Sequence, residues 1–310
     1  MTTDTAHRTS LLLLGAGLLL LSALLFAGAT VFVKLGAETA GITGRTSAFV
    51  RFLFGAILIS AFALAKRKSL RPVAPRLVAL RVITNTLAVV LFFSGLQLTT
   101  VTHANMLNMT YPVFVFAVAP LLNRESSPPV YYLFLALTLA GIYLVLAPAD
   151  GLAFSQVNAG DLLALASAGA AAIAISALRE ARKHDSSFLI LFHLFVFGTV
   201  VSFFVMLPGF TMPPQAAVFP LLGVAVCAFA GQLTLTVGYR YISAAGGAIV
   251  SAARIAFAAV LGTVVFADPI GWKTILGGAF ILVSLIGVSG VVPTLSRLRV
   301  WRRDAARKSA

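Results

Sequence analysis

Acidic residues, cysteine and charge in general are scarce in this 310-residue chain, and each scarcity excludes a class of protein. There are 9 Asp and Glu residues against 23 Lys and Arg, and charged residues make up only 10% of the chain. The 60% share of hydrophobic residues is more than one soluble core of this length can bury. The single cysteine, Cys227, excludes a disulfide and a cysteine metal site. No phosphate-binding Gly-rich motif is present, so we expect neither ATP hydrolysis nor a cofactor.

The chain consists instead of apolar runs, each close to the thickness of a bilayer. Roughly 20 helical residues cross the hydrocarbon, where every span must satisfy its own backbone hydrogen bonds. We therefore predict an all-α integral membrane protein. The ten predicted transmembrane helices are 11–35, 45–65, 77–97, 102–122, 130–147, 160–178, 187–207, 216–237, 243–266 and 271–292. The first run resembles a secretory signal, but it is longer than a signal core, so we predict an uncleaved helix.

Lysine and arginine are concentrated in the loops that follow even-numbered spans, and in the tail. These residues include Lys66, Arg67, Lys68, Arg71, Arg76, Arg124, Arg179, Arg182, Lys183, Arg240, Arg297, Arg299, Arg302 and Arg303. By the positive-inside rule, both termini are expected to be cytoplasmic, in a multi-pass protein of the inner (plasma) membrane. The net charge of +14 then reflects contact with anionic lipid and not with nucleic acid. We expect a monomer or a homodimer.

Two parts of the chain follow a similar pattern. Gly95 near the end of the third span is followed 30 residues later by Glu125, and Gly238 is followed by Asp268 at the same spacing. The two patterns lie 143 positions apart, which pairs spans one to five with spans six to ten. Because five is odd, the second half enters the membrane from the opposite side. We predict two inverted five-helix repeats, 1–150 and 151–310, as in many secondary transporters.

The chain resembles the drug/metabolite transporter superfamily, in particular its ten-helix EamA-type members, over nearly its whole length. The matching features are Arg51 before Phe52, Gly95-Leu96-Gln97 followed by Ala104, Pro112, Glu125, Gly160-Asp161-Leu162, Asp268, and Gly277-Gly278. Ile255 and Asp268 differ from the Pro and Glu that the family often carries. The resemblance implies two inverted halves around a shared cavity and transport of small metabolites, often export.

Polar side chains within the spans are few, and such residues usually face a cavity or a partner. Arg254 lies about 16 Å inside the ninth span and shares a small, polar stripe with Ser243, Gly247 and Ser251. A guanidinium there can bind a carboxylate or phosphate. No mid-span acid is available to pair with it, which favours an anionic ligand. The alternative is a structural arginine bound to carbonyl groups at a helix break.

Further candidate residues lie on three other spans. Asn105, Asn108 and Tyr111 share a face of the fourth span beside Pro112, and Tyr111 matches Arg254 by the 143-residue offset. The other candidates are Asn85 in the third span, and Gln232, Thr236 and Tyr239 in the eighth. Interhelical hydrogen bonding is the alternative for all of these. The predicted substrate-binding set is Arg254, Ser251, Asn108, Asn105, Tyr111, Asn85, Gln232 and Tyr239.

These features predict a secondary transporter of a small anionic or zwitterionic metabolite, such as an amino acid, working by alternating access. Export is the expected direction. The alternatives are an exporter of apolar or aromatic compounds and an intramembrane enzyme. An enzyme needs clustered titratable groups, whereas His103 and His193 are isolated. A channel would need a filter sequence or rings of repeated groups, and neither is visible.

Overall fold

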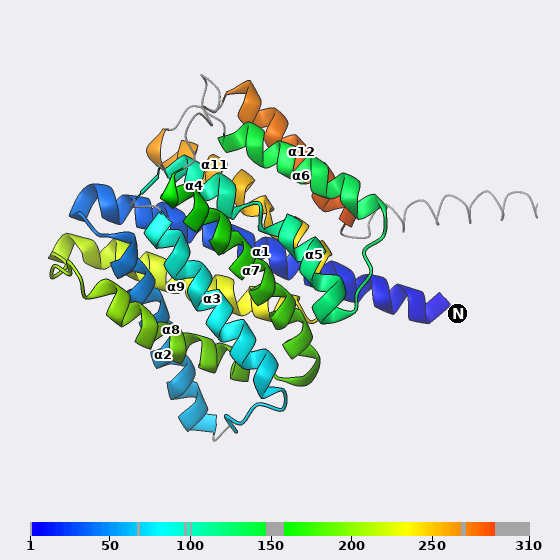
Figure 1. The fold of residues 1–310 in the computed structure, drawn as a ribbon, viewed down its shortest axis with the longest axis horizontal. Helices are drawn as coiled ribbons and strands as arrows, with labels where there is room; N and C mark the ends of the chain where they lie inside the picture. Colours follow the sequence, from blue (N-terminus) through cyan, green and yellow to red (C-terminus); the bar gives the residue numbers. More distant parts are fainter. Residues whose placement is uncertain are drawn as a thin grey trace, which may run out of the picture.

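In a computed structural model the chain is helical, and no strand occurs in the residues that the structure describes (Figure 1). These residues are 2–66, 69–95, 98–99, 101–146, 158–267 and 271–288; side chains are described from residue 10 on, except 101–103. The α-helices are α1 (Thr2–Ala40), α2 (Gly44–Lys66), α3 (Pro75–Gly95), α4 (Val101–Asn108), α5 (Tyr111–Asn123), α6 (Val130–Leu146), α7 (Ala159–His184), α8 (Ser187–Met206), α9 (Val218–Gly238), α10 (Ala244–Ser251), α11 (Ala253–Phe266) and α12 (Trp272–Val288). A 3₁₀ turn, η1 (Gln215–Ala217), precedes α9.

Eight stretches of this bundle are long and apolar enough to cross a membrane. They are Ser10–Ala40, Gly44–Lys66, Pro75–Gly95, Ala104–Asn123, Ala159–His184, Ser187–Met206, Gln215–Gly238 and Ala244–Phe266. The shorter apolar helices α6 and α12 have 17 residues each, a rise of about 25 Å. The prediction of an all-α membrane protein is confirmed.

Four predicted spans differ from the observed helices. The first, predicted at 11–35, extends over Thr2–Ala40 as α1. The sixth, predicted at 160–178, continues to His184 as α7, so Arg179 and Arg182 belong to its last turns and not to a loop. The fourth and ninth, predicted as continuous, are each broken. Hydropathy did not reveal these breaks because the apolar character continues through them.

The two breaks occupy equivalent positions in the two halves of the chain. Met109 and Thr110 separate α4 from α5, and Ala252 separates α10 from α11. Met109 and Ala252 lie 143 positions apart. The helices beyond the breaks end on Arg124 and Ala267, with left-handed φ angles of 53° and 55°. Those two residues are also 143 positions apart, so the offset seen in the sequence recurs in the backbone.

The most extensive helix contacts also come in matching pairs. Helix α3 packs along α7, and α1 packs along α9. Glycines permit both approaches: a Cβ on Gly95 would lie 2.8 Å from the carbonyl oxygen of Gly160, and one on Gly238 would lie 3.3 Å from that of Gly15. Helix α6 lies beside α12 at one edge of the bundle, and α2 packs against α8 at another (Figure 1).

Large apolar side chains occupy both the interior and the outer surface. Leu19, Phe52 and Ile249 belong to one buried cluster that draws on both halves of the chain. On the outside, Leu64 is 80% exposed and Leu121 is 84% exposed. An apolar exterior of this extent is expected where lipid tails, and not water, surround the helices.

Candidate functional site

The two helix breaks lie against one another: α10 packs against α5, and Arg254 beside the second break contacts Met109 in the first. At the first break, the amide of Thr110 donates only three residues back, to the carbonyl oxygen of Leu107 at 3.2 Å, and Pro112 has no amide hydrogen to donate to the preceding turn. At the second, the amides of Ala252 and Ile255 donate three residues back, at 3.1 and 3.0 Å, which tightens the helix into a 3₁₀ turn. The second break therefore forms without the proline that the first one has.

Arg254 lies at the second break and reaches the first. It is the second residue of α11, and its Nη2 donates to the Sδ of Met109 at 3.1 Å. Met109 is only 2% exposed, so this contact is internal. A thioether is a weak acceptor, and a guanidinium carries five donors. Most of the donor capacity of Arg254 thus remains for another acceptor.

Tyr111, Tyr239 and Ser251 form a polar cluster beside Arg254, which we name the tyrosine–serine cluster. The hydroxyl of Tyr111 donates across the two halves to the carbonyl oxygen of Ala248 at 3.2 Å. Tyr239 is fully buried, with its ring against Gly247. The Oγ of Ser251 lies near both phenols, but it meets the geometry of a hydrogen bond with neither.

The other predicted residues have different surroundings. Asn108 donates to the Oγ of Ser167 on α7 at 2.7 Å, an interhelical bond of the kind left open as the alternative. Asn105 lies one turn before Asn108 on α4 and also takes part in a polar interaction. The amide nitrogens of Asn85 and Gln232 are buried and have no hydrogen-bond partner among the described residues.

Two arginines outside the predicted substrate-binding set lie near these residues, and only Arg51 was singled out in the sequence, by the family resemblance. Arg81 on α3 is 1% exposed and lies within electrostatic reach of Tyr239. Arg51 on α2 lies 4.9 Å from the centre of the Phe52 ring, and its charge repels that of Arg254. The sequence offered one indication that Arg81 faces the polar interior: it lies one helical turn before Asn85 on α3, so the two side chains share a face.

None of Arg51, Arg81 and Arg254 forms an ion pair within the described part of the chain. The acidic residues whose side chains are described all lie at or near helix ends: Glu38, Glu125, Asp161, Glu180 and Asp185. Several of them cap helices. Asp161 forms a capping box with Asn158, and the carboxylate of Asp185 accepts from the amides of Val73 and Ala74 before α3. Acid is therefore kept away from the interior arginines.

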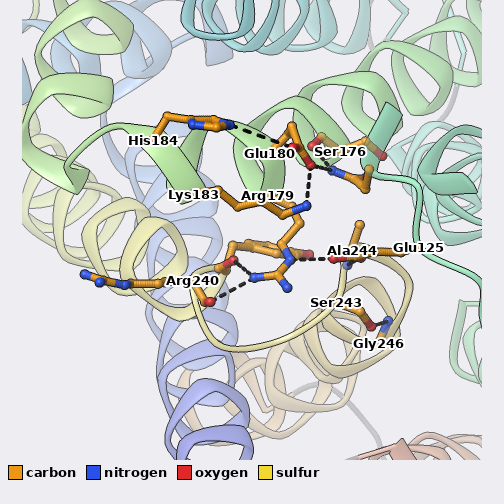
Figure 2. Close-up of polar contacts among 12 residues, drawn as sticks. Glu125, Ser176, Arg179, Glu180, Lys183, His184, Arg240, Ser243, Ala244 and Gly246 are labelled. Carbon is orange, nitrogen blue, oxygen red and sulfur yellow. Dashed lines mark hydrogen bonds and ion pairs between the residues drawn. The ribbon is translucent and has the colours of Figure 1, made fainter. Parts of the chain in front are cut away.

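A second polar network connects several helices at one end of the bundle. We name this the arginine-rich end because it carries Arg124, Arg179, Arg182 and Arg240. Arg179 lies between Glu125 and the carbonyl groups of Tyr239 and Arg240, and Figure 2 shows its side chain between Glu125 and Arg240. Its Nε donates to Glu125 at 2.8 Å, and its Nη1 donates to the two carbonyls at 3.1 and 2.8 Å.

Glu125 completes this bridge by capping a distant helix. Its Oε2 accepts from the amide of Ala244, at the start of α10, at 3.1 Å, although the two residues are 119 positions apart. We name the set the Glu125–Arg179 bridge. It joins the ends of α5, α7 and α9 to the start of α10.

A separate pocket of about 90 Å³ lies between α1 and α11. It is lined by Ala27, Thr30, Val31, Lys34, Ala258, Gly262 and Phe266. The ammonium of Lys34 sits 4.0 Å from the centre of the Phe266 ring. None of the predicted site residues lines this pocket. No group of three or more metal-binding side chains occurs in the described ranges.

Comparisons with known proteins agree with this architecture. The model of the EamA-like transporter family matches residues 13–147 and again residues 158–290. The pseudopaline exporter CntI of Pseudomonas aeruginosa is 26% identical, over 89% of this chain and 97% of its own length. Human solute carrier family 35 member G1 is 25% identical, over 89% and 79%. A solved protein structure superposes with a TM-score of 0.73 at 18% identity, covering 91% of this chain and 97% of its own.

Proposed function

Because the chain belongs to the EamA-like transporter family, we propose that it is a secondary transporter that exports a small anionic or zwitterionic metabolite across the inner membrane. Relatives named as an exporter and as a solute carrier support transport. These names point to a transporter and not to an enzyme. The half-buried Arg254 and the buried Arg81, neither of which pairs with a carboxylate among the described residues, support a substrate that carries negative charge.

The proposed architecture is ten membrane-spanning helices in two inverted five-helix repeats, 1–150 and 151–310. Two separate family matches, one in each half, support the repeat. So do the paired contacts of α3 with α7 and of α9 with α1, together with helix breaks and left-handed residues 143 positions apart. Since each repeat has an odd number of spans, the two halves have opposite orientations. This arrangement lets one half rock against the other around a central site.

In the proposed mechanism, the two facing helix breaks hold the substrate. Broken helices near the middle of the membrane supply backbone groups that a continuous helix would use internally. Arg254 binds the anionic group through the donors that Met109 leaves unused. Ser251, Tyr111 and Tyr239 add hydroxyl groups beside it, and Asn85, Asn105, Asn108 and Gln232 extend the polar wall.

The Glu125–Arg179 bridge is the proposed gate on one side. It lies at the arginine-rich end, which the positive-inside rule assigns to the cytoplasm together with both termini. The bridge ties the start of α10, just before the second break, to the ends of α5, α7 and α9. When the bridge opens, the tyrosine–serine cluster becomes accessible from that side.

The observation that carries this proposal is Arg254, held at the facing breaks with no carboxylate partner in the described part of the chain. The test is counterflow by the purified protein in liposomes, screened against amino acids, organic acids, sugars and nucleosides. We expect uptake of an anionic or zwitterionic compound, and a loss of about 100-fold or more in Arg254→Ala, because bidentate charge-assisted bonds are removed.

Arg254→Lys is the matched variant, because it keeps the charge but not the planar fork. We expect it to retain partial transport. Circular dichroism and monodisperse elution must match the wild type for each variant. Normal counterflow of an anionic substrate by Arg254→Ala would refute the role of Arg254, and transport of neutral compounds only would refute the substrate class.

A further inference from the structure

Arg81 is the most deeply buried charged group in the part of the chain that the structure describes. Its side chain is 1% exposed, and its Nε has no hydrogen-bond partner there. It lies six residues beyond Pro75, or about 9 Å from the start of α3. An arginine that snorkels to water from this depth would expose its head group, and Arg81 does not. A buried, unpaired charge is strongly disfavoured unless a partner arrives from outside the protein.

Three other buried polar groups on α3 and α9 can donate a hydrogen bond but have no partner among the described residues. The hydroxyl of Tyr239, which is fully buried and within electrostatic reach of Arg81, has no hydrogen-bond partner among the described groups. The same is true of Nδ2 of Asn85, one turn further along α3, and of Nε2 of Gln232, two turns before Tyr239 on α9. A ligand that satisfies this set must be rich in acceptors and carry negative charge. A carboxylate or phosphate meets both requirements.

Arg81 and Arg254 are both linked to the tyrosine–serine cluster. Tyr239 lies within electrostatic reach of Arg81, Tyr111 lies within reach of Arg254, and Ser251 lies near both phenols. A small molecule that contacts the tyrosine–serine cluster can therefore reach both guanidinium groups.

We propose that Arg81 and Tyr239 form a second anion-binding subsite, and that the transported compound is a small dianion, such as a dicarboxylate, whose second charged group binds there. This inference rests on the proposed transport function. It narrows the class of substrate from compounds with at least one negatively charged group to compounds with two such groups. Arg254 takes one group, Arg81 the other, and the hydroxyls of the cluster contact the part between them.

The experiment compares probes that differ by one carboxylate: succinate with butyrate, and glutamate with glutamine. Affinity is measured as the ligand-dependent rise in the melting temperature of the purified, detergent-solubilised protein. The wild type should bind the dicarboxylate of each pair at least about 10-fold more tightly, because one charge-assisted contact contributes roughly 10- to 100-fold. This measurement needs no variant and is independent of any folding defect.

Arg81→Gln should abolish that preference while leaving the affinity for butyrate and glutamine unchanged. Tyr239→Phe, which removes only the hydroxyl, should reduce the preference by about 3- to 10-fold. Arg76→Gln is the matched control, because it removes an exposed charge from the same helix, and it should behave like the wild type. A purely structural arginine would alter both members of a pair equally.

Equal affinity of the wild type for both members of each pair overturns the second subsite. So does an undiminished preference in Arg81→Gln. If either result appears while Arg254→Ala still loses anion transport, the transport function stands and only the dianion assignment falls. If the wild type neither binds nor transports any anionic probe, the proposed function fails as well.

Discussion

Removing the carboxylate of Glu125 should open the arginine-rich end. In the structure Glu125 makes two bonds with two different parts of the bundle: Oε1 accepts from Nε of Arg179, and Oε2 accepts from the amide of Ala244. Glu125→Gln keeps the shape of the side chain but has only one acceptor. Its NH₂ group must then face one of the two donors. The bridge therefore loses one bond and the charge assistance of the other.

The expected size of the effect follows from these contacts. Losing one charge-assisted bond and weakening another costs the bridged state about 2 kcal/mol. Glu125 and Arg179 are 21% and 18% exposed, so solvent screening reduces this value only in part. Since about 1.4 kcal/mol is tenfold in an equilibrium constant, the population of the open state should rise about 5- to 30-fold.

A reporter cysteine measures that population. Cys227 is the only cysteine, so Cys227→Ala gives a cysteine-free background, and Ser251→Cys then places a thiol in the tyrosine–serine cluster. Inside-out vesicles are treated with a membrane-impermeant maleimide at a concentration where labelling is slower than gating, so that the rate follows the open population. Glu125→Gln should raise the labelling rate about 5- to 30-fold from this side, and right-side-out vesicles should show no such rise.

Glu180→Gln is the matched control. Glu180 lies at the same end, and its contacts with Lys183 and His184 stay within α7. Its one hydrogen bond to another helix, from Nδ2 of Asn123 at 3.3 Å, can be kept by the amide oxygen of Gln. Removal of the Glu180 charge should change the labelling rate less than about twofold, since such ion pairs contribute little. An unchanged rate in Glu125→Gln, or an equal rise in the control, would show that the bridge is not the gate.

Two further predictions concern helix packing. Gly160→Ala should lower the melting temperature, by an amount equivalent to about 1–3 kcal/mol, because the new methyl group meets the backbone of Gly95. Gly169→Ala, on the same helix with open space around it, should be neutral or stabilising. Equal effects of the two substitutions would contradict the close approach of α3 and α7. Asn108→Ala and Ser167→Ala, measured singly and together, should give a coupling energy of about 0.6–1.7 kcal/mol for their 2.7 Å bond, and a coupling near zero would mean that the bond does not form in the membrane.

Much of the fold was predictable because lipid imposes a local rule. A helix in hydrocarbon must satisfy its own backbone and present apolar side chains over about 20 residues, and both requirements are visible in any short window of sequence. The spans near α2, α3, α8 and α9 were accordingly predicted within a few residues. The breaks before Tyr111 and at Ala252 were not, because the tight turns there do not interrupt the apolar run.

Candidate site residues could be named from the sequence only where a polar group interrupts an apolar span or where the two halves of the chain match. Arg254, Ser251 and Tyr111 stood out because polar groups are rare within spans and because a constant offset relates the two halves. The hydrogen bond of Asn108 to Ser167 depends on the packing of α4 against α7, and no spacing within either helix indicates it.

The chain's composition and periodicity thus determine that it is a helical membrane protein and which few polar residues lie at membrane depth. Only the tertiary structure decides which of those residues meet. Glu125 caps a helix 119 residues away, and Arg81 is buried next to Tyr239 without a carboxylate. The physical reason is the distance along the chain over which each property is set. Hydropathy is a property of each residue and its near neighbours, whereas an interhelical hydrogen bond or a buried, unpaired charge exists only once two distant helices have packed.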